Sequence, residues 1–155
     1  MLSLKRTNSE EKDFIELAAQ LDEYLRVKDG REHSFYAQYN KIDKIKNVIV
    51  AYEGGKPAGC GAIKEYDKDT MEIKRMFVKP EMRGGRIGSK ILIELENWAA
   101  ELNYARCILE TGKRQPEAVR LYEKNGYRLI PNYGQYRGIE NSLCFEKELE
   151  KNKNA

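Results

Sequence analysis

The spacing of apolar residues changes along the chain, and each change marks an expected element. In the N-terminal third, the spacing is three and four residues, as on one helical face, at Phe14, Leu17, Ala18, Leu21, Tyr24 and Leu25. Asn8 followed by Glu11 is typical of a capping box before this helix, and Asp29-Gly30 is expected to end it. A second, weaker helix is predicted from Phe35, Tyr39 and Ile42.

From residue 47 the pattern is that of β-strands. Strands are expected over Asn47 to Glu53, Ala58 to Glu65 and Met71 to Val78. Glycine, proline and aspartate mark turns at residues 54–57 and 67–70. Three antiparallel strands in succession are the predicted result.

Helices and strands follow one another in the C-terminal half. The expected elements are an amphipathic helix over residues 87–102, a strand over 105–111, a helix from Pro116 to Gly126, and strands over 127–133 and 141–149. The whole order, β-α-α-β-β-β-α-β-α-β-β, predicts an α/β fold with a mixed, mostly antiparallel sheet flanked by helices. We expect one domain over residues 1–150 and a frayed tail over 151–155.

Composition narrows the possible partners. The chain has 155 residues, of which 41% are apolar and 34% charged, as in a globular domain. Its net charge of +3 is too small to indicate nucleic acid. No apolar run approaches the roughly 18 residues that a membrane span needs, and residues 1–6 lack the apolar core of a signal peptide. Neither a nucleic acid nor a membrane is therefore expected as a partner.

The cysteines and the single histidine suggest no metal or disulfide chemistry. Cys60, Cys107 and Cys144 are odd in number and far apart, each inside an apolar segment, which favours buried core thiols over a nucleophile. Such thiols are typical of a reducing compartment, so a cytoplasmic location is predicted. His33 has no partner nearby in sequence and is expected at a helix start or on the surface.

A glycine-rich segment between a predicted strand and a predicted helix is the candidate binding site. It reads Arg83-Gly84-Gly85-Arg86-Ile87-Gly88-Ser89. Glycines allow close backbone approach, and the free N–H groups and dipole of a helix start attract anions. Arg83 and Arg86 add charged donors suited to phosphate. The segment is therefore expected to bind a phosphate or pyrophosphate.

Other interpretations of this loop are weaker. A P-loop needs Gly-Lys-Ser/Thr, whereas the chain runs Gly88-Ser89-Lys90. A dinucleotide fingerprint would follow the first strand of a βαβ unit, whereas this loop follows three hairpin strands. A further interpretation, that the glycines form a turn that only links the strand to the helix, is not excluded by the sequence.

Two motifs resemble those of the GNAT superfamily of acyl-CoA-dependent N-acyltransferases. Residues 83–88 are similar to its Gln/Arg-x-x-Gly-x-Gly/Ala motif, with Arg86 where the first glycine usually stands. Residues 116–127, Pro-Glu-Ala-Val-Arg-Leu-Tyr-Glu-Lys-Asn-Gly-Tyr, resemble its later signature, and Gln115 stands where many members have Asn. The resemblance implies a GNAT-like fold and acetyl-CoA as the acyl donor.

The resemblance also implies roles in binding the cofactor. The strands at 71–78 and 105–111 would part to admit the pantetheine arm, which would pair with the backbone of Met76, Phe77 and Val78. The amide near Met76 or Phe77 would polarise the thioester carbonyl. Pyrophosphate would lie on the amides of residues 83–89, and Gln115 and Tyr122 would also contact the cofactor.

The resemblance implies direct transfer without an acyl-enzyme. Tyr122 matches the family's general acid, although a packed core tyrosine is its ordinary interpretation. Glu72 matches the position of a base in some members, and its ordinary interpretation is a solvent-facing carboxylate. Further side chains could line the acceptor pocket, although packing or strand surface is their ordinary interpretation: Tyr36, Tyr39, Glu65, Glu110, Tyr133 and Tyr136.

The expected function is acetyl transfer from acetyl-CoA to a primary amine of a small molecule. A small pocket closed by residues 133–136 would favour that function, and an open groove would favour a protein lysine or N-terminus as acceptor. A non-catalytic acyl-CoA-binding module is the alternative from another class. A homodimer is possible, since dimers are common in the family.

Overall fold

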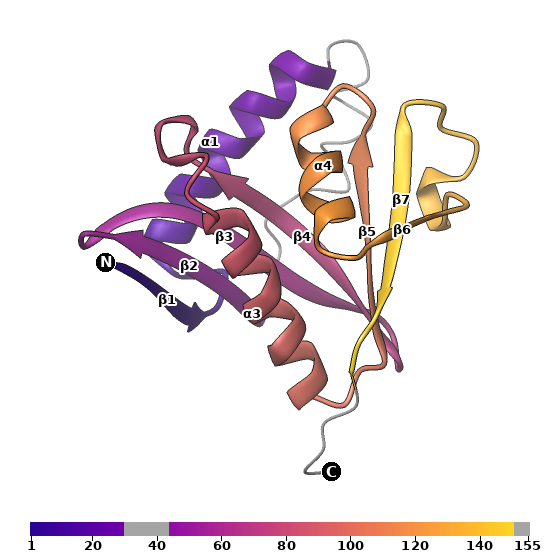
Figure 1. Cartoon of the computed structure of the whole chain (residues 1–155), viewed down its shortest axis with the longest axis horizontal. Coiled ribbons are helices and arrows are strands. Elements are labelled where there is room, and N and C mark those ends of the chain that lie inside the picture. The colour runs from indigo at the N-terminus through magenta and orange to yellow at the C-terminus, as the bar shows by residue number, and fades with distance from the viewer. Residues whose placement is uncertain (30–43, 151–155) are drawn as a thin grey trace.

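The computed structural model describes residues 1–29 and 44–150 (Figure 1). Its elements are β1 (Leu2–Thr7), α1 (Lys12–Asp29), β2 (Asn47–Glu53), β3 (Lys56–Asp67), β4 (Thr70–Val78), α3 (Ile87–Glu101), β5 (Arg106–Gly112), α4 (Pro116–Lys124), β6 (Arg128–Ile130) and β7 (Ser142–Glu148). Short 3-10 turns occupy Pro80–Met82 and Gly134–Tyr136. The second helix predicted from Phe35, Tyr39 and Ile42 lies outside the described residues, as do His33, Tyr36 and the tail at 151–155.

One seven-stranded sheet has the order β1-β2-β3-β4-β5-β7-β6. Every neighbouring pair is antiparallel except β4 and β5, which run parallel. In Figure 1, α1 and α3 lie on opposite faces of the β1–β4 half, and α4 lies beside β5. The predicted α/β class with a mostly antiparallel sheet is confirmed.

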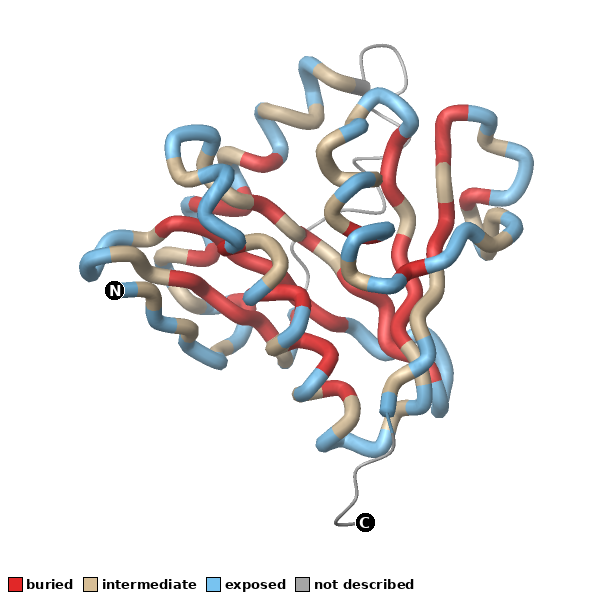
Figure 2. The backbone as a smooth tube through the Cα atoms, viewed as in Figure 1, coloured by how far each residue is buried: buried red, intermediate tan, exposed pale blue. Residues whose placement is uncertain are grey.

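The core consists of two layers, one on each face of the sheet. On β2, Val48 and Val50 pack into the cluster that contains the apolar face of α1. The alternate residues Ile49 and Ala51 pack into the cluster that contains α3. This two-residue alternation is what a strand covered on both faces requires. Figure 2 shows the buried positions running along the central strands.

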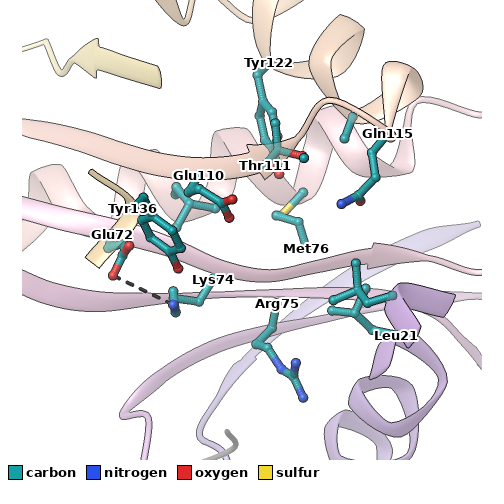
Figure 3. A pocket seen from close by; sticks show the side chains of 14 residues that line it. Leu21, Glu72, Lys74, Arg75, Met76, Glu110, Thr111, Gln115, Tyr122 and Tyr136 are labelled. Carbon is teal, nitrogen blue, oxygen red and sulfur yellow. Dashed lines mark ion pairs between the residues drawn. The ribbon is translucent and has the colours of Figure 1, made fainter. Parts of the chain in front are cut away.

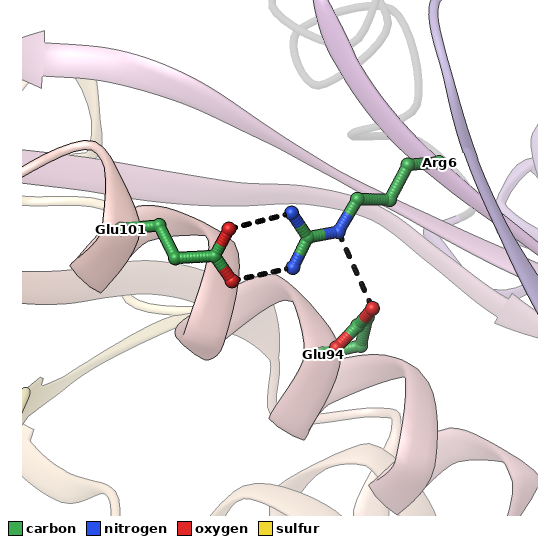
Figure 4. Close-up of polar contacts among 3 residues, drawn as sticks. All are labelled: Arg6, Glu94 and Glu101. Atoms are coloured by element: carbon green, nitrogen blue, oxygen red, sulfur yellow. Dashed lines mark hydrogen bonds and ion pairs between the residues drawn. The ribbon is translucent and has the colours of Figure 1, made fainter.

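The N-terminal strand β1 was expected in the order of elements, without bounds, and it forms an edge of the sheet. Arg6 fastens it to α3: two guanidinium nitrogens donate to Glu101 at 2.8 and 2.7 Å, and Nε donates to Glu94 at 3.3 Å (Figure 4). The same guanidinium lies 4.8 Å from the ring centroid of Trp98. The strand is thus held by β2, its neighbour on the sheet, and by α3.

Two local predictions were wrong. The capping box is absent, because the Asn8 carboxamide accepts from the N–H of Glu10 and the Glu11 carboxylate accepts from Lys5 at 2.8 Å. Asn8 therefore makes a turn before the helix, which begins at Lys12. The strand expected over 127–133 is only three residues long, Arg128–Ile130, since that is where pairing with β7 occurs.

Two glycines in β3 allow close packing. A Cβ atom on Gly59 would lie 2.7 Å from the carbonyl oxygen of Phe77 in β4. A Cβ atom on Gly61 would lie 2.6 Å from Sδ of Met76 and 2.9 Å from side-chain carbons of Ile91 and Leu95 in α3. Only glycine therefore fits at these two positions without movement of its neighbours.

The sheet opens between β4 and β5. Their pairing covers three positions, Thr70–Glu72 opposite Arg106–Ile108, and ends there. The register of β4 on β3 then shifts, and Arg75 within this bulge has φ of 57°. The Arg75 guanidinium donates to both carboxylate oxygens of Asp22 in α1, at 2.7 and 3.1 Å. The expected parting of the two strands is therefore present, with a bulge at its start.

Candidate active site

A cavity of about 460 Å³ lies where β4 parts from β5, between β4, α4 and the glycine loop. The residues predicted to bind the cofactor line it, with the exception of Gly85: Met76, Phe77, Val78, Arg83, Gly84, Arg86, Ile87, Gly88, Ser89, Gln115 and Tyr122. The structure therefore brings the two sequence motifs together around one space.

The glycine loop has the geometry of an anion site. Arg86 is the N-cap of α3 and has φ of 66°, the left-handed conformation that glycine most readily adopts. Its side chain makes no capping hydrogen bond, so the first N–H groups of α3 have no side-chain cap. Gly84 has φ of 93° and open space where a Cβ would be. Arginine at position 86 thus keeps the loop conformation and adds a cation.

Arg83 lines the cavity and contacts both β4 and α1. Its Nε donates to the carbonyl oxygen of Val78 at 3.0 Å, and its guanidinium carbon lies 5.1 Å from the ring centroid of Tyr24 in α1. The Tyr24 hydroxyl donates to the carboxylate of Glu117 at the start of α4. These contacts form a bridge, Arg83–Tyr24–Glu117, that links the glycine loop, α1 and α4.

Sequence reasoning missed two cations on α4. Arg120 and Lys124 line the same cavity as the glycine loop. Their spacing of four residues places them on one helical face, and this was the available signal. Asn125, just past α4, donates to Oγ of Ser89 at 3.1 Å and fixes this end of the helix against the start of α3.

A second cavity of about 90 Å³ adjoins the first. Both cavities are lined by Leu21, Met76, Gln115, Ala118 and Tyr122. In Figure 3, Met76 and Tyr122 lie on opposite sides of the gap near its middle, and four polar lining side chains gather to the left of them: Glu72, Lys74, Glu110 and Tyr136.

Tyr122 reaches this junction from α4 and is only 6% exposed. Its ring packs against Tyr127 and Phe145, with centroids 5.9 and 6.3 Å away. Burial, and to a lesser extent the negative charge of Glu110, raises the pKa of the Tyr122 hydroxyl above its usual value. The hydroxyl therefore keeps its proton at neutral pH.

Glu72 is the last β4 residue that pairs with β5, and it is only 9% exposed. The Tyr133 hydroxyl donates to Oε2 of Glu72 at 2.6 Å, and Nζ of Lys74 lies 3.9 Å from Oε1. Burial lowers the pKa of Lys74, and the nearby carboxylates of Glu72 and Glu110 oppose that effect. The interpretation of Glu72 as a solvent-facing carboxylate is therefore wrong.

The other candidate side chains divide into two groups. Tyr136 and Glu110 line the small cavity, and Tyr133 packs over Glu72. Glu65 is exposed and accepts a hydrogen bond from Tyr104.

The cysteines are core residues, as expected. Cys60, Cys107 and Cys144 are free and buried, and burial raises their pKa values to about 12, 12 and 11. Their thiols are therefore protonated and unreactive at neutral pH.

Residues 1–29 and 44–150 contain neither a candidate metal centre nor a helix suited to a membrane. No group of three histidine, cysteine, aspartate or glutamate residues in these ranges could hold a metal ion. No helix in the same ranges is both long enough and apolar enough to cross a membrane.

Comparisons with known proteins agree with this geometry. Residues 11–127 match the model of the acetyltransferase (GNAT) family. The chain is 34% identical over 137 residues to the IAA acetyltransferase of Azospirillum brasilense, covering 87% of this chain and 90% of that one. The chain therefore belongs to the GNAT family. It is an acyl-CoA-dependent N-acyltransferase, and its acyl donor is acetyl-CoA.

Solved structures support the same assignment. A Klebsiella pneumoniae protein assigned as an acyl-CoA N-acyltransferase is 28% identical, with a TM-score of 0.81 over 97% of this chain and 99% of that one. The PaiA N-acetyltransferase of Thermoplasma acidophilum, solved with coenzyme A, has the same fold at 18% identity, with a TM-score of 0.67 over 96% and 99% of the two chains. The predicted GNAT fold is confirmed.

Proposed function

We propose that this protein transfers the acetyl group of acetyl-CoA to a primary amine of a small molecule, by direct attack of the amine. The observation that carries the proposal is the junction of the two cavities at Met76 and Tyr122. A large cavity with an anion-binding loop meets there a small cavity that contains Glu72. The donor side and the acceptor side of a transferase would be arranged in this way.

The large cavity fits an elongated polyanion. The amides at the start of α3 and the cations Arg86, Arg120 and Lys124 would hold phosphate groups. Met76 has no register partner on β3, whereas Phe77 is opposite Cys60. We therefore assign to the Met76 amide, rather than that of Phe77, the role of donating to the acyl carbonyl. Acetyl-CoA, when bound, supplies the activated acetyl group as a thioester.

Tyr122 is the proposed general acid. A thiol has a reference pKa of about 8.5 and a tyrosine about 10, so a phenol is a competent donor to a departing sulfur only if it is itself protonated. Burial ensures this at Tyr122, because it raises the pKa of the hydroxyl. The packing of its ring against Tyr127 and Phe145 fixes the direction from which the proton would come.

Glu72 is the proposed general base. An amine attacks only in its neutral form, so a group on the acceptor side must remove a proton. Glu72 lines the small cavity and is buried, with Lys74 beside one oxygen and Tyr133 bonded to the other. These contacts hold the carboxylate in one place on the acceptor side.

The small volume on the acceptor side supports a small amine. About 90 Å³ accommodates a few heavy atoms beyond the reacting nitrogen, and Tyr136 at its wall is only 2% exposed. A protein lysine or N-terminus would be admitted more readily by an open groove. The three buried thiols support a reducing compartment, and we extend the proposal to a cytoplasmic location.

The first experiment measures binding. Thermal unfolding is followed with and without acetyl-CoA, with NAD and ATP as controls. Ligand at about 100 times its dissociation constant should add about 2.7 kcal/mol to the free energy of unfolding, a rise in Tm of several degrees. An equal rise with ATP would mean a generic anion site and would contradict the proposal.

The second experiment measures turnover by release of free thiol. The acceptors are an amino acid, an aliphatic diamine, an arylalkylamine, a peptide with a free N-terminus, and IAA, the compound named for the Azospirillum relative. Tyr122→Phe and Glu72→Gln should each lower kcat by about 10²–10⁴, with the acetyl-CoA shift in Tm retained. Full turnover in either variant would remove that residue's role. Turnover with the peptide alone would favour protein acetylation, and binding with no turnover would favour a non-catalytic module.

A further inference from the structure

The loop between β6 and β7 places one hydroxyl on the proposed base, which lies in β4. Tyr133 and Glu72 are 61 positions apart in sequence, yet their side chains meet at 2.6 Å. Tyr133 donates to Oε2, and the other oxygen, Oε1, has Lys74 Nζ as its neighbour at 3.9 Å. The two carboxylate oxygens are therefore in different surroundings.

Tyr133 is held in place from several directions. The Asn132 side chain donates to the carbonyl oxygens of Tyr136 and Ile139, at 3.1 and 3.0 Å, and so closes the loop on itself. The ring of Tyr133 packs edge-on against Tyr66, with centroids 5.2 Å apart, and against Tyr136, with centroids 5.7 Å apart. Its hydroxyl consequently has little freedom to leave Glu72.

The titratable groups around Glu72 come from every neighbouring strand. Among the described residues they are Lys64, its cross-strand partner on β3, then Lys74 on β4, Glu110 on β5, Cys144 on β7, and Tyr133 and Tyr136 on the loop. Of these, Tyr133 donates a hydrogen bond to the carboxylate. Burial and the neighbouring charge of Glu72 raise the pKa of Tyr133, so it remains a donor.

We propose that Tyr133 is a positioning residue for acetyl transfer, whose hydroxyl fixes Oε2 of Glu72 and leaves Oε1 to take the proton of the acceptor amine. This inference rests on the proposed role of Glu72 as base. A hydrogen bond from a phenol favours the ionised carboxylate over the protonated one. The same bond prevents rotation of the carboxylate, which keeps one oxygen directed at the acceptor side.

The first test titrates Glu72 directly. Protein labelled with ¹³C at the glutamate carboxyl carbons is followed by NMR from pH 3.5 to 8, and the Glu72 signal is the one missing from Glu72→Gln. Tyr133→Phe keeps the ring and removes the hydroxyl. We expect the midpoint of the Glu72 titration to rise by at least about one pH unit in this variant, as loss of a hydrogen bond to a charged group predicts. Tyr66→Phe, which removes a hydroxyl from the neighbouring ring, is the matched control and should leave the midpoint unchanged.

The second test asks whether this contact serves catalysis. The value of kcat/KM is measured as a function of pH for the variant and the wild type, with the best acceptor of the amine panel. The ratio of the two values is then compared across pH, because the ionisation of the amine affects both proteins equally and cancels in the ratio. For Tyr133→Phe the ratio should fall toward acid pH by about tenfold, as a carboxylate with a higher pKa is protonated earlier. For Tyr66→Phe it should stay level. Thermal unfolding of both variants, expected near the wild-type Tm, separates this effect from a loss of structure.

The outcomes are distinguishable. An unchanged Glu72 midpoint in Tyr133→Phe overturns the inference whatever the base is. A shifted midpoint with a pH-independent rate ratio overturns the positioning role. Full turnover of Glu72→Gln instead refutes the proposed base, and the inference that rests on it, even if the NMR midpoint shifts.

Discussion

Alanine at Gly59 should destabilise the protein, and alanine at Gly88 should not. The Cβ atom added at Gly59 would lie 2.7 Å from the Phe77 carbonyl oxygen, 3.2 Å from Cδ1 of Ile91 and 3.3 Å from Cα of Val78. Two of these neighbours are backbone atoms of the paired strand, so relief requires β3 and β4 to separate. At Gly88 the nearest atom is Cδ2 of Leu121 at 3.4 Å, an ordinary contact.

The size of the effect follows from two opposing contributions. Overpacking of a filled core costs about 1–3 kcal/mol. Replacement of glycine also lowers the conformational entropy of the unfolded chain, which stabilises the folded protein by about 0.4–1 kcal/mol. The two ranges combine to a net loss of about 0–2.6 kcal/mol. The approach of 2.7 Å to a backbone oxygen places Gly59→Ala in the upper part of this range, at about 1–2.6 kcal/mol, or a fall in Tm of about 2–10 °C for a chain of this size. Gly88→Ala lies in the first turn of α3 and should hold or slightly raise the Tm.

Urea unfolding monitored by the single tryptophan, Trp98, gives the free energies and the m-values. Equal m-values with a lower midpoint for Gly59→Ala would agree with a local clash. Wild-type midpoints for both variants would refute the close approach of β3 to β4. A larger loss at Gly88 than at Gly59 would refute the comparison of their surroundings.

Two other predictions concern charged side chains. Asp22→Asn should lower the free energy of unfolding in urea by about 1–2 kcal/mol, because the buried Arg75 guanidinium loses its counter-charge while half-exposed Asp22 is partly screened by solvent. The control is Glu23→Gln, which breaks an exposed ion pair with Arg26 and should cost less than about 0.5 kcal/mol. Equal costs for the two variants would contradict the role of burial. Arg86→Gly should leave the Tm within a few degrees of the wild-type value, since glycine readily adopts φ of 66°. The variant should bind acetyl-CoA several-fold more weakly, and its affinity should depend less on salt concentration. Titration calorimetry at two salt concentrations measures both effects, and an unchanged affinity would show that Arg86 does not contact the ligand.

Much of the fold was predictable because its signals are local. The strand at Asn47–Glu53 was predicted with its observed bounds, since a run of apolar residues ends at a pair of glycines. The helix that begins at Ile87 was likewise marked by its glycine loop and apolar stripe. The capping-box prediction was wrong because both side chains have other partners available. The Asn8 carboxamide accepts from the Glu10 N–H in a turn, and the Glu11 carboxylate pairs with Lys5 on β1 instead of capping the helix.

The site was predictable as a set of motifs but not as a set of contacts. Nothing in the sequence indicated that an arginine, Arg75, would take a positive φ and form the bulge in β4. Arg83 was assigned to phosphate from its place in a motif, whereas its packing on Tyr24 depends on α1, far away in sequence. The bond between Tyr133 and Glu72 likewise requires the register of several strands at once.

The short ladder between β4 and β5 has a consequence for the order in which the molecule opens. The β1–β4 half and the β5–β7 half share backbone pairing at three positions. Amide protons there and along the fork where β4 and β5 part should exchange with solvent through partial openings that leave each half intact, and so more readily than those in the centre of β2 and β3. A ligand that contacts both sides of the fork would join the two halves. Its binding should therefore slow the exchange of amide protons in both β4 and β5.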